Sequence, residues 1–110
     1  MRFKKPQNRG PEDFSRIRLP HENEGEMFAI VTAMRGAGKL TVDCDDGKTR
    51  MGRIPGKMKK RVWVRLGDLI IVKPWIVQSD ERCDVVWRYL KTQSNWIQRK
   101  GLIKTLSYDS

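Results

Sequence analysis

The sequence has few of the residues from which catalytic and metal sites are usually built. Its 110 residues include a single histidine, His21, and only two cysteines, Cys44 and Cys83, which lie far apart and belong to no CxxC pair. A metal site would therefore depend almost entirely on carboxylates, and no acid–base pair or ligand cluster stands out. Cys83, between Arg82 and Asp84, has no histidine near it that could activate it as a nucleophile. We expect no metal, no cofactor and no enzymatic activity.

Long apolar stretches are also absent. No segment approaches the roughly 20 apolar residues of a membrane-spanning helix, and no apolar run of the kind found in secretory signals follows the basic residues 1–6. Two isolated cysteines in such a chain are typical of reduced thiols rather than of a structural disulfide. The composition therefore predicts a soluble, cytoplasmic monomer, and 110 residues are enough for one domain with a modest core.

Acidic residues are scarce relative to basic ones. The chain has 23 lysines and arginines against 13 acids, a net charge of +10, which favours a polyanionic partner. Residues 47–73 contain nine basic residues and one acid, whereas residues 21–46 contain two basic residues and six acids. Residues 1–20 carry six basic side chains and two acids, interrupted by prolines and a glycine, and this pattern predicts a flexible basic arm.

Hydrophobic alternation predicts short strands rather than long helices. Residues 39–45 place Leu40, Val42 and Cys44 on one face. Asp46-Gly47 predicts a hairpin whose two central residues have positive φ. The same criteria predict strands over 27–34, 39–45, 48–54, 68–75 and 83–90, a helical turn over 57–61, and a helix that is capped by Thr92 or Ser94 and ends near Lys100.

Five short strands with a helical insert between the third and fourth predict an all-β fold with a C-terminal helix: a five-stranded OB-fold β-barrel of S1-like type. The barrel would occupy residues 21–90, and residues 91–110 would form a helix and tail packed on it. Trp87 is expected in the core, Trp96 is expected to anchor the helix, and Trp75 is expected to cover one end of the barrel.

The basic surplus coincides with the part of an OB barrel that usually binds nucleic acid. In this fold the second and third strands and their neighbouring loops form the oligonucleotide face. Charge and predicted topology therefore indicate one RNA-binding surface. Trp63 follows the basic insert directly and either stacks on a base or packs inward. The basic cluster comprises Lys48, Arg50, Arg53, Lys57, Lys59, Lys60, Arg61, Arg65 and Lys73.

Several ordered blocks of the sequence resemble the translation initiation factor 1A family. The longest block, residues 46–64 (DGKTRMGRIPGKMKKRVWV), resembles the core of that family, as do residues 67–75 and 83–89. The stretch IPGKM at residues 54–58 is also similar to bacterial initiation factor one. The resemblance extends from about residue 18 to residue 101, and it is with archaeal members in particular, because residues 101–110 contain only one acid, whereas eukaryotic members carry a long acidic tail.

The resemblance implies an OB-fold that binds the small ribosomal subunit at the aminoacyl-tRNA (A) site and helps to place initiator tRNA and mRNA. The implied partners are 16S ribosomal RNA, other initiation factors and the initiator tRNA complex. The basic residues between Arg2 and Arg18 would correspond to the family's N-terminal tail, which reaches toward the decoding centre. The family's rRNA-contacting positions would fall on Lys39, Arg50, Arg53, Lys57, Lys59, Lys60 and Arg61, with Trp63 beside them, and Lys48 and Arg65 complete the candidate set.

Other functions remain open at this point. A general single-strand-binding or cold-shock-type RNA chaperone would use several exposed aromatic rings, and the predicted second and third strands have no closely spaced set of them. An OB-scaffold nuclease would need a metal-dependent centre. Binding to a membrane surface would need a basic amphipathic helix longer than residues 57–61.

Overall fold

The computed structural model describes residues 17–56, 64–104 and 106. It confirms the five predicted strands and the C-terminal helix, with ends that differ only slightly from the predicted ones. The helical turn predicted over 57–61 and most of the predicted arm lie outside the described residues. The elements are a 3-10 turn η1 (Glu22–Glu24), the strands β1 (Met27–Gly36), β2 (Lys39–Cys44), β3 (Thr49–Arg53), β4 (Leu69–Pro74) and β5 (Arg82–Arg88), and the helix α2 (Lys91–Arg99).

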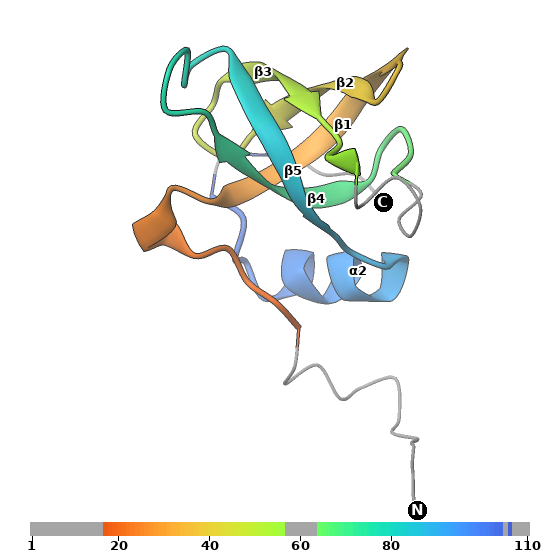
Figure 1. Cartoon of the computed structure of the whole chain (residues 1–110). Coiled ribbons are helices and arrows are strands. Elements are labelled where there is room, and N and C mark those ends of the chain that lie inside the picture. The colour runs from red at the N-terminus through yellow and green to blue at the C-terminus, as the bar shows by residue number, and fades with distance from the viewer. Residues whose placement is uncertain (1–16, 57–63, 105, 107–110) are drawn as a thin grey trace, which may run out of the picture.

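The five strands form a closed barrel in the order β1-β2-β3-β5-β4 (Figure 1). Pairing is antiparallel between β1 and β2, β2 and β3, β4 and β5, and β1 and β4. The remaining pair, β3 with β5, is parallel. Because the sheet closes on itself, none of the five described strands has a free edge. Pro74, which has no N–H to donate, stands at the end of β4.

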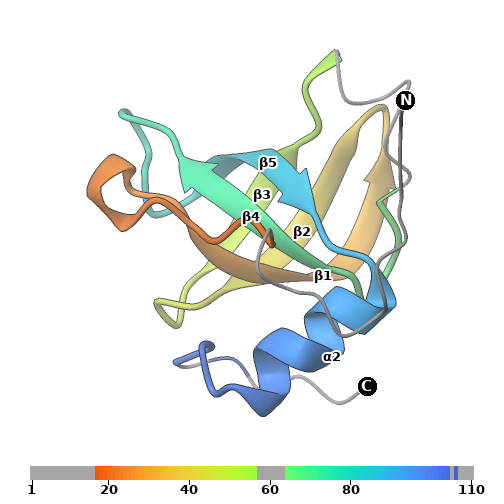
Figure 2. The same ribbon diagram turned by 90° about the horizontal axis from the view of Figure 1, so that it is seen from below.

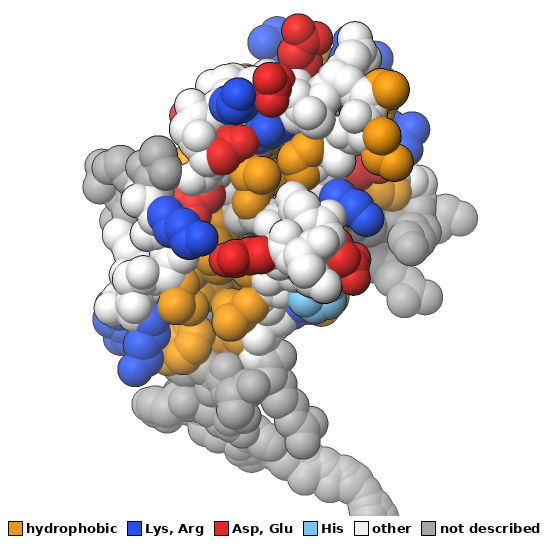
Figure 3. Space-filling view, turned by 90° about the vertical axis from the view of Figure 1, so that its left-hand side faces the viewer, with side chains coloured by type: hydrophobic (Ala, Val, Ile, Leu, Met, Phe, Trp, Pro, Cys, Tyr) orange, Lys and Arg blue, Asp and Glu red, His pale blue; other side chains and the backbone are white. Residues whose placement is uncertain are grey.

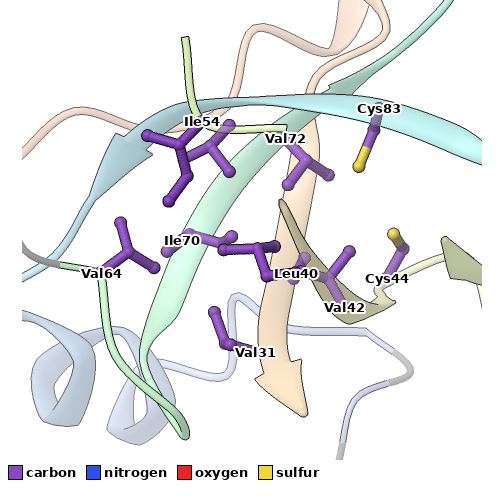
Figure 4. Close-up of a cluster of buried hydrophobic side chains, with 11 residues drawn as sticks. Val31, Leu40, Val42, Cys44, Ile54, Val64, Ile70, Val72 and Cys83 are labelled. Carbon is purple, nitrogen blue, oxygen red and sulfur yellow. The ribbon is translucent and has the colours of Figure 1, made fainter. Parts of the chain in front are cut away.

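Alternating side chains of the strands fill the barrel interior. Leu40, Val42 and Cys44 all point inward from β2, as predicted, and pack with residues such as Val72 (Figure 4). Cys44 and Cys83 are both free and buried within this cluster. Their hydrogen bond and their burial raise the pKa of the Cys83 thiol. Buried thiols of this kind behave as small apolar side chains rather than as nucleophiles.

A second apolar cluster joins α2 to the outside of β1 and β4 (Figure 2). Ile97 of α2 is fully buried there against Phe28 and Ile71, and Trp96 is partly buried at the same interface, as expected for a ring that anchors the helix. The phenol of Tyr89 donates a hydrogen bond to the carbonyl oxygen of Arg18. The last residues of the predicted arm therefore lie against the barrel.

Two sequence predictions about the end of β5 and the start of α2 are wrong. Trp87 was expected in the core, but its side chain is 42% exposed. A register shift between Ile71 and Val72 causes this, because a one-residue shift moves the following side chains to the other face. Neither predicted cap residue begins α2. Its N-cap is Leu90, whose N–H donates to the Oε1 atom of Gln93 at 2.9 Å.

The two hairpins at the ends of β2 also differ from each other. Between β1 and β2, Ala37 and Gly38 both have positive φ, 53° and 76°. They form the two-residue turn whose backbone twist matches that of the flanking strands. At the Asp46-Gly47 hairpin only Gly47 has positive φ, 87°, so the predicted conformation of Asp46 is wrong. The N–H of Gly47 donates to the carbonyl oxygen of Cys44 at 3.0 Å, which makes this loop one residue longer than the predicted turn.

Candidate nucleic-acid interface

Four strands bring charged side chains into one row on the outside of the barrel. Lys39 of β2 is opposite Arg53 of β3, and Arg53 is opposite Asp84 of β5. Lys73 of β4 is also opposite Asp84. All four residues alternate with inward-facing neighbours, so their side chains share the outer surface of the sheet. This row, from here on the Lys39–Lys73 row, contains three cations and one carboxylate.

An aromatic ring lies beside the row among arginines. The Nε1–H group of Trp75 donates to the Oδ1 atom of Asp84 at 3.0 Å, and the Nε atom of Arg53 lies 3.3 Å from the same oxygen. The guanidinium carbons of Arg53 and Arg82 lie 5.7 and 5.9 Å from the centre of the Trp75 ring, within the range of cation–π attraction. Asp84 therefore orients the ring and one arginine rather than neutralising the whole surface.

A surface groove of about 610 Å³ runs next to this ring. Trp75, Lys73 and Pro55 all line it. Pro55 also stands just before the predicted basic insert in the sequence. Five of the candidate RNA-binding residues, Lys57, Lys59, Lys60, Arg61 and Trp63, lie outside the described residues.

Arg50 does not lie on this exposed face, contrary to the prediction. It is only 4% exposed, and its Nε atom donates to the carbonyl oxygen of Ser79 at 2.6 Å. Its two terminal nitrogens donate to the two carboxylate oxygens of Asp46 at 3.0 and 2.8 Å. The hydrogen bond to Asp46 raises the pKa of Arg50, and the same bond lowers the pKa of the Asp46 carboxyl. Arg50 therefore joins the β2–β3 hairpin to the β4–β5 loop.

The other described candidates are exposed. Lys48 lies 3.3 Å from a carboxylate oxygen of Asp80, and both side chains are largely exposed, so this ion pair contributes little to stability. Arg65 is exposed just before β4, where its backbone N–H donates to Asp68 at 2.8 Å. Neither residue belongs to the Lys39–Lys73 row.

Sequence reasoning missed three residues of this surface. Arg82 and Trp75 were not chosen as candidates, and Arg35 was not considered, although its Nε atom donates to Thr41 Oγ1 on the outer face of β2 at 3.0 Å. Lys73 was counted in the basic cluster but not chosen as a contact. Strand parity could have identified Lys73 and Arg82, because each is next to a residue that the apolar pattern places inside.

A closed barrel of this strand order belongs to the OB-fold class, whose second and third strands and whose loops after the first and fourth strands bind oligonucleotides or oligosaccharides. In this chain Lys39 and Arg53 lie on the second and third strands and Trp75 lies in the loop after the fourth, whereas Lys73 and Asp84 lie on β4 and β5 themselves. Among the described residues, no helix is long and apolar enough to cross a membrane.

Comparison with known proteins identifies the family. The family model described as "Translation initiation factor 1A / IF-1" matches residues 15–109, so the chain belongs to this family. Its members are initiation factors rather than enzymes, in agreement with the sequence-based expectation.

Curated relatives named "Translation initiation factor 1A" are similar over most of their length. One from Methanococcus maripaludis strain C5 is 53% identical over 94 residues, covering 86% of this chain and 91% of the relative. One from Methanococcus aeolicus is 50% identical over 106 residues, covering 96% and 98%. One from Archaeoglobus fulgidus is 52% identical over 93 residues, covering 84% and 95%. The resemblance to archaeal members is therefore confirmed.

Proposed function

We propose that this initiation factor binds the small ribosomal subunit near the A site and promotes placement of initiator tRNA and mRNA there. The observation that carries the proposal is the Lys39–Lys73 row, which gathers three cations from three strands and one carboxylate from a fourth beside Trp75. Ribosomal RNA is the partner whose charge and exposed bases suit such a surface. Other initiation factors and the initiator tRNA complex would assemble around the bound protein.

The residues have distinct roles in this proposal. Lys39, Arg53, Lys73 and Arg82 contact phosphates of 16S ribosomal RNA, since exposed lysines and arginines neutralise phosphates and release counterions. Trp75 offers an aromatic surface held in place by Asp84. The insert residues Lys57, Lys59, Lys60 and Arg61, together with Trp63 and the exposed Lys48 and Arg65, are further candidate RNA contacts in this proposal.

The test is sedimentation of the purified factor with small ribosomal subunits over a series of salt concentrations. Replacing Lys39→Gln and Arg53→Gln together should weaken binding and flatten its salt dependence, by a slope of about 0.9 per lost duplex contact or about 0.7 per lost single-strand contact. The control, Arg99→Gln with Lys100→Gln, removes two charges from the end of α2 and should change neither quantity. Lys59→Glu with Lys60→Glu tests the insert in the same assay. Unchanged affinity and slope in the row variant would exclude this surface.

A general single-strand RNA-binding protein is the second candidate. The Trp75 ring between two arginines favours it, because aromatic and guanidinium groups stack on bases of any sequence. The two functions differ in their preferred partner. An initiation factor should bind small subunits far more tightly than a free unstructured oligonucleotide at equal salt, whereas a general RNA chaperone should bind the two alike.

A further inference from the structure

A second groove lies on a different face from the Lys39–Lys73 row. It has a volume of about 350 Å³ and lies where η1, β1, the β2–β3 hairpin and the segment after α2 meet. Pro20, Met27, Phe28 and Leu102 give it an apolar lining. Figure 3 shows this side of the molecule, with apolar side chains in a hollow that several acidic side chains border. From here on we call it the acid-rimmed groove.

Carboxylates outnumber cations around this groove among the described residues. Glu22, Glu26, Asp45 and Asp46 line it, and Glu24 of η1 is exposed beside it. Three cations, Arg18, Arg50 and Lys104, pair with acids of this set. Five carboxylates therefore stand against three cations around the groove, in a chain whose net charge is +10.

Part of this negative charge is held in place by backbone donors. Both carboxylate oxygens of Asp45 accept a hydrogen bond from the N–H of Lys104 at 3.0 Å, and one accepts another from the N–H of Leu106 at 3.1 Å. These backbone donors hold the Asp45 carboxylate in place at the edge of the groove. Glu22 pairs with Lys104 at 3.4 Å, but both side chains are more than 70% exposed, so solvent screens this attraction.

The charge and shape of the groove select the chemistry of its occupant. A negative rim repels phosphates and attracts lysines and arginines, so RNA is a poor occupant and a basic polypeptide a good one. The apolar lining adds room for a large hydrophobic side chain, and its volume lies at the small end of the roughly 300–1,000 Å³ of ligand pockets. We propose that the acid-rimmed groove docks a basic segment of a protein partner, with one hydrophobic side chain of that segment inserted between Met27 and Leu102.

The probe for this proposal is a synthetic peptide in which a leucine–phenylalanine pair is flanked by lysines. It is titrated into the full-length, ¹⁵N-labelled protein, and amide shifts are followed by NMR. We expect saturable shifts at Met27, Phe28 and Leu102. A second peptide with two serines in place of the leucine–phenylalanine pair should bind more weakly, because it has no side chain for the groove.

Matched variants separate the groove from general charge attraction. Glu22→Gln with Glu24→Gln should weaken binding of the first peptide by about threefold to tenfold, the effect of removing two largely exposed charge contacts. Asp80→Asn with Glu81→Gln removes the same charge from the β4–β5 loop and should change the affinity far less.

Three results would overturn the proposal: equal binding of both peptides, shifts centred away from the groove, or equal loss of affinity in the two double variants. Two further titrations test other occupants. Stronger perturbation of the groove by an oligouridylate than by the peptide would assign it to RNA. Shifts confined to His21, Glu24 and Glu26 with zinc chloride alone, and no response to the peptide, would assign it to a cation. None of these measurements involves the ribosome, so their outcome is independent of the proposed function.

Discussion

The guanidinium of Arg50 donates two parallel hydrogen bonds, of 3.0 and 2.8 Å, to the carboxylate of Asp46. The Arg50 side chain is almost completely buried. A pair with this geometry is among the stronger charge-assisted contacts in proteins. It also fixes the β4–β5 loop, because the same guanidinium donates to Ser79. The two arginines of β3, Arg50 and Arg53, consequently have different roles, although both belong to the same basic cluster in the sequence.

Loss of Arg50 should destabilise the protein much more than loss of Arg53. Arg50→Gln leaves Asp46 and Ser79 without their donor and should lower the free energy of unfolding by about 2–4 kcal/mol, somewhat below the full range for buried pairs because Asp46 remains partly exposed. Arg53→Gln, at an exposed side chain, should cost less than about 1 kcal/mol. Urea denaturation measures both values. Equal losses in the two variants would contradict the structural role of Arg50.

Acid should weaken the protein partly through Asp46. The hydrogen bond from Arg50 lowers the pKa of the folded Asp46 carboxyl, so the unfolded chain binds its proton at higher pH than the folded chain does. This contribution to stability is complete above the ordinary pKa of about 4 and is lost as the pH falls through the lowered folded value. Asp46→Asn should therefore reduce the difference between the free energies of unfolding at pH 6 and at the acid end of the titration.

The control for this pH series is Glu81→Gln, which removes an exposed carboxylate from the β4–β5 loop. Its unfolding free energy should follow the wild-type pH dependence. If Asp46→Asn retains the full wild-type pH dependence as well, Arg50 does not hold the Asp46 carboxylate in its charged form.

The turn between β1 and β2 should tolerate one substitution and reject another. Ala37 has a φ of 53°, a conformation that costs an ordinary L-residue roughly 1–2 kcal/mol but that asparagine adopts readily. Ala37→Asn should raise the free energy of unfolding by about 0.5–1 kcal/mol. Ala37→Val, with a branched side chain at the same φ, should lower it. Thermal or urea unfolding that ranks the two variants in the opposite order would show that the turn has another conformation.

The contact between Gly52 and Leu40 should be visible as an energetic coupling. A Cβ atom on Gly52 would lie 2.8 Å from the Cδ1 atom of Leu40, which is fully buried. Gly52→Ala should therefore destabilise the barrel by about 1–3 kcal/mol. Leu40→Val removes a methylene at the point of contact, so the double variant should be more stable than the sum of the two single losses predicts, by about 0.5–3 kcal/mol.

Gly56→Ala is the matched control for the glycine substitution. No atom of the described residues lies within 4 Å of the position that its Cβ would occupy. The substitution should leave the free energy of unfolding nearly unchanged. Strict additivity of Gly52→Ala and Leu40→Val would mean that the two positions do not meet inside the barrel.

Local alternation predicted the strands and the barrel interior well, because each strand must turn one face inward. Leu40, Val42 and Cys44 satisfy that rule without any information from elsewhere in the chain. The same rule failed for Trp87, since the register shift in the β4–β5 pair depends on how two strands meet and leaves no mark in the alternation of either.

The charged surface was predictable only in part. The sequence located the basic surplus on β3 and the insert, but it could not show which cations are engaged by hydrogen-bond acceptors of the protein itself. Arg50 is engaged by Ser79, 29 positions away, and Arg53 shares Asp84 with Trp75 only because β3, β5 and the end of β4 converge. Such groupings are decided by strand order, which short-range patterns do not specify.

The parallel pairing of β3 with β5 has a consequence for biosynthesis. Its three residue pairs join positions that are about thirty residues apart in the sequence. During synthesis the β2–β3 hairpin therefore remains an incomplete sheet until residues up to Arg88 have left the ribosome. During that interval β3 has an unprotected edge, which is where association with another nascent chain could begin. Folding of this initiation factor thus requires that most of its own chain has already been synthesised.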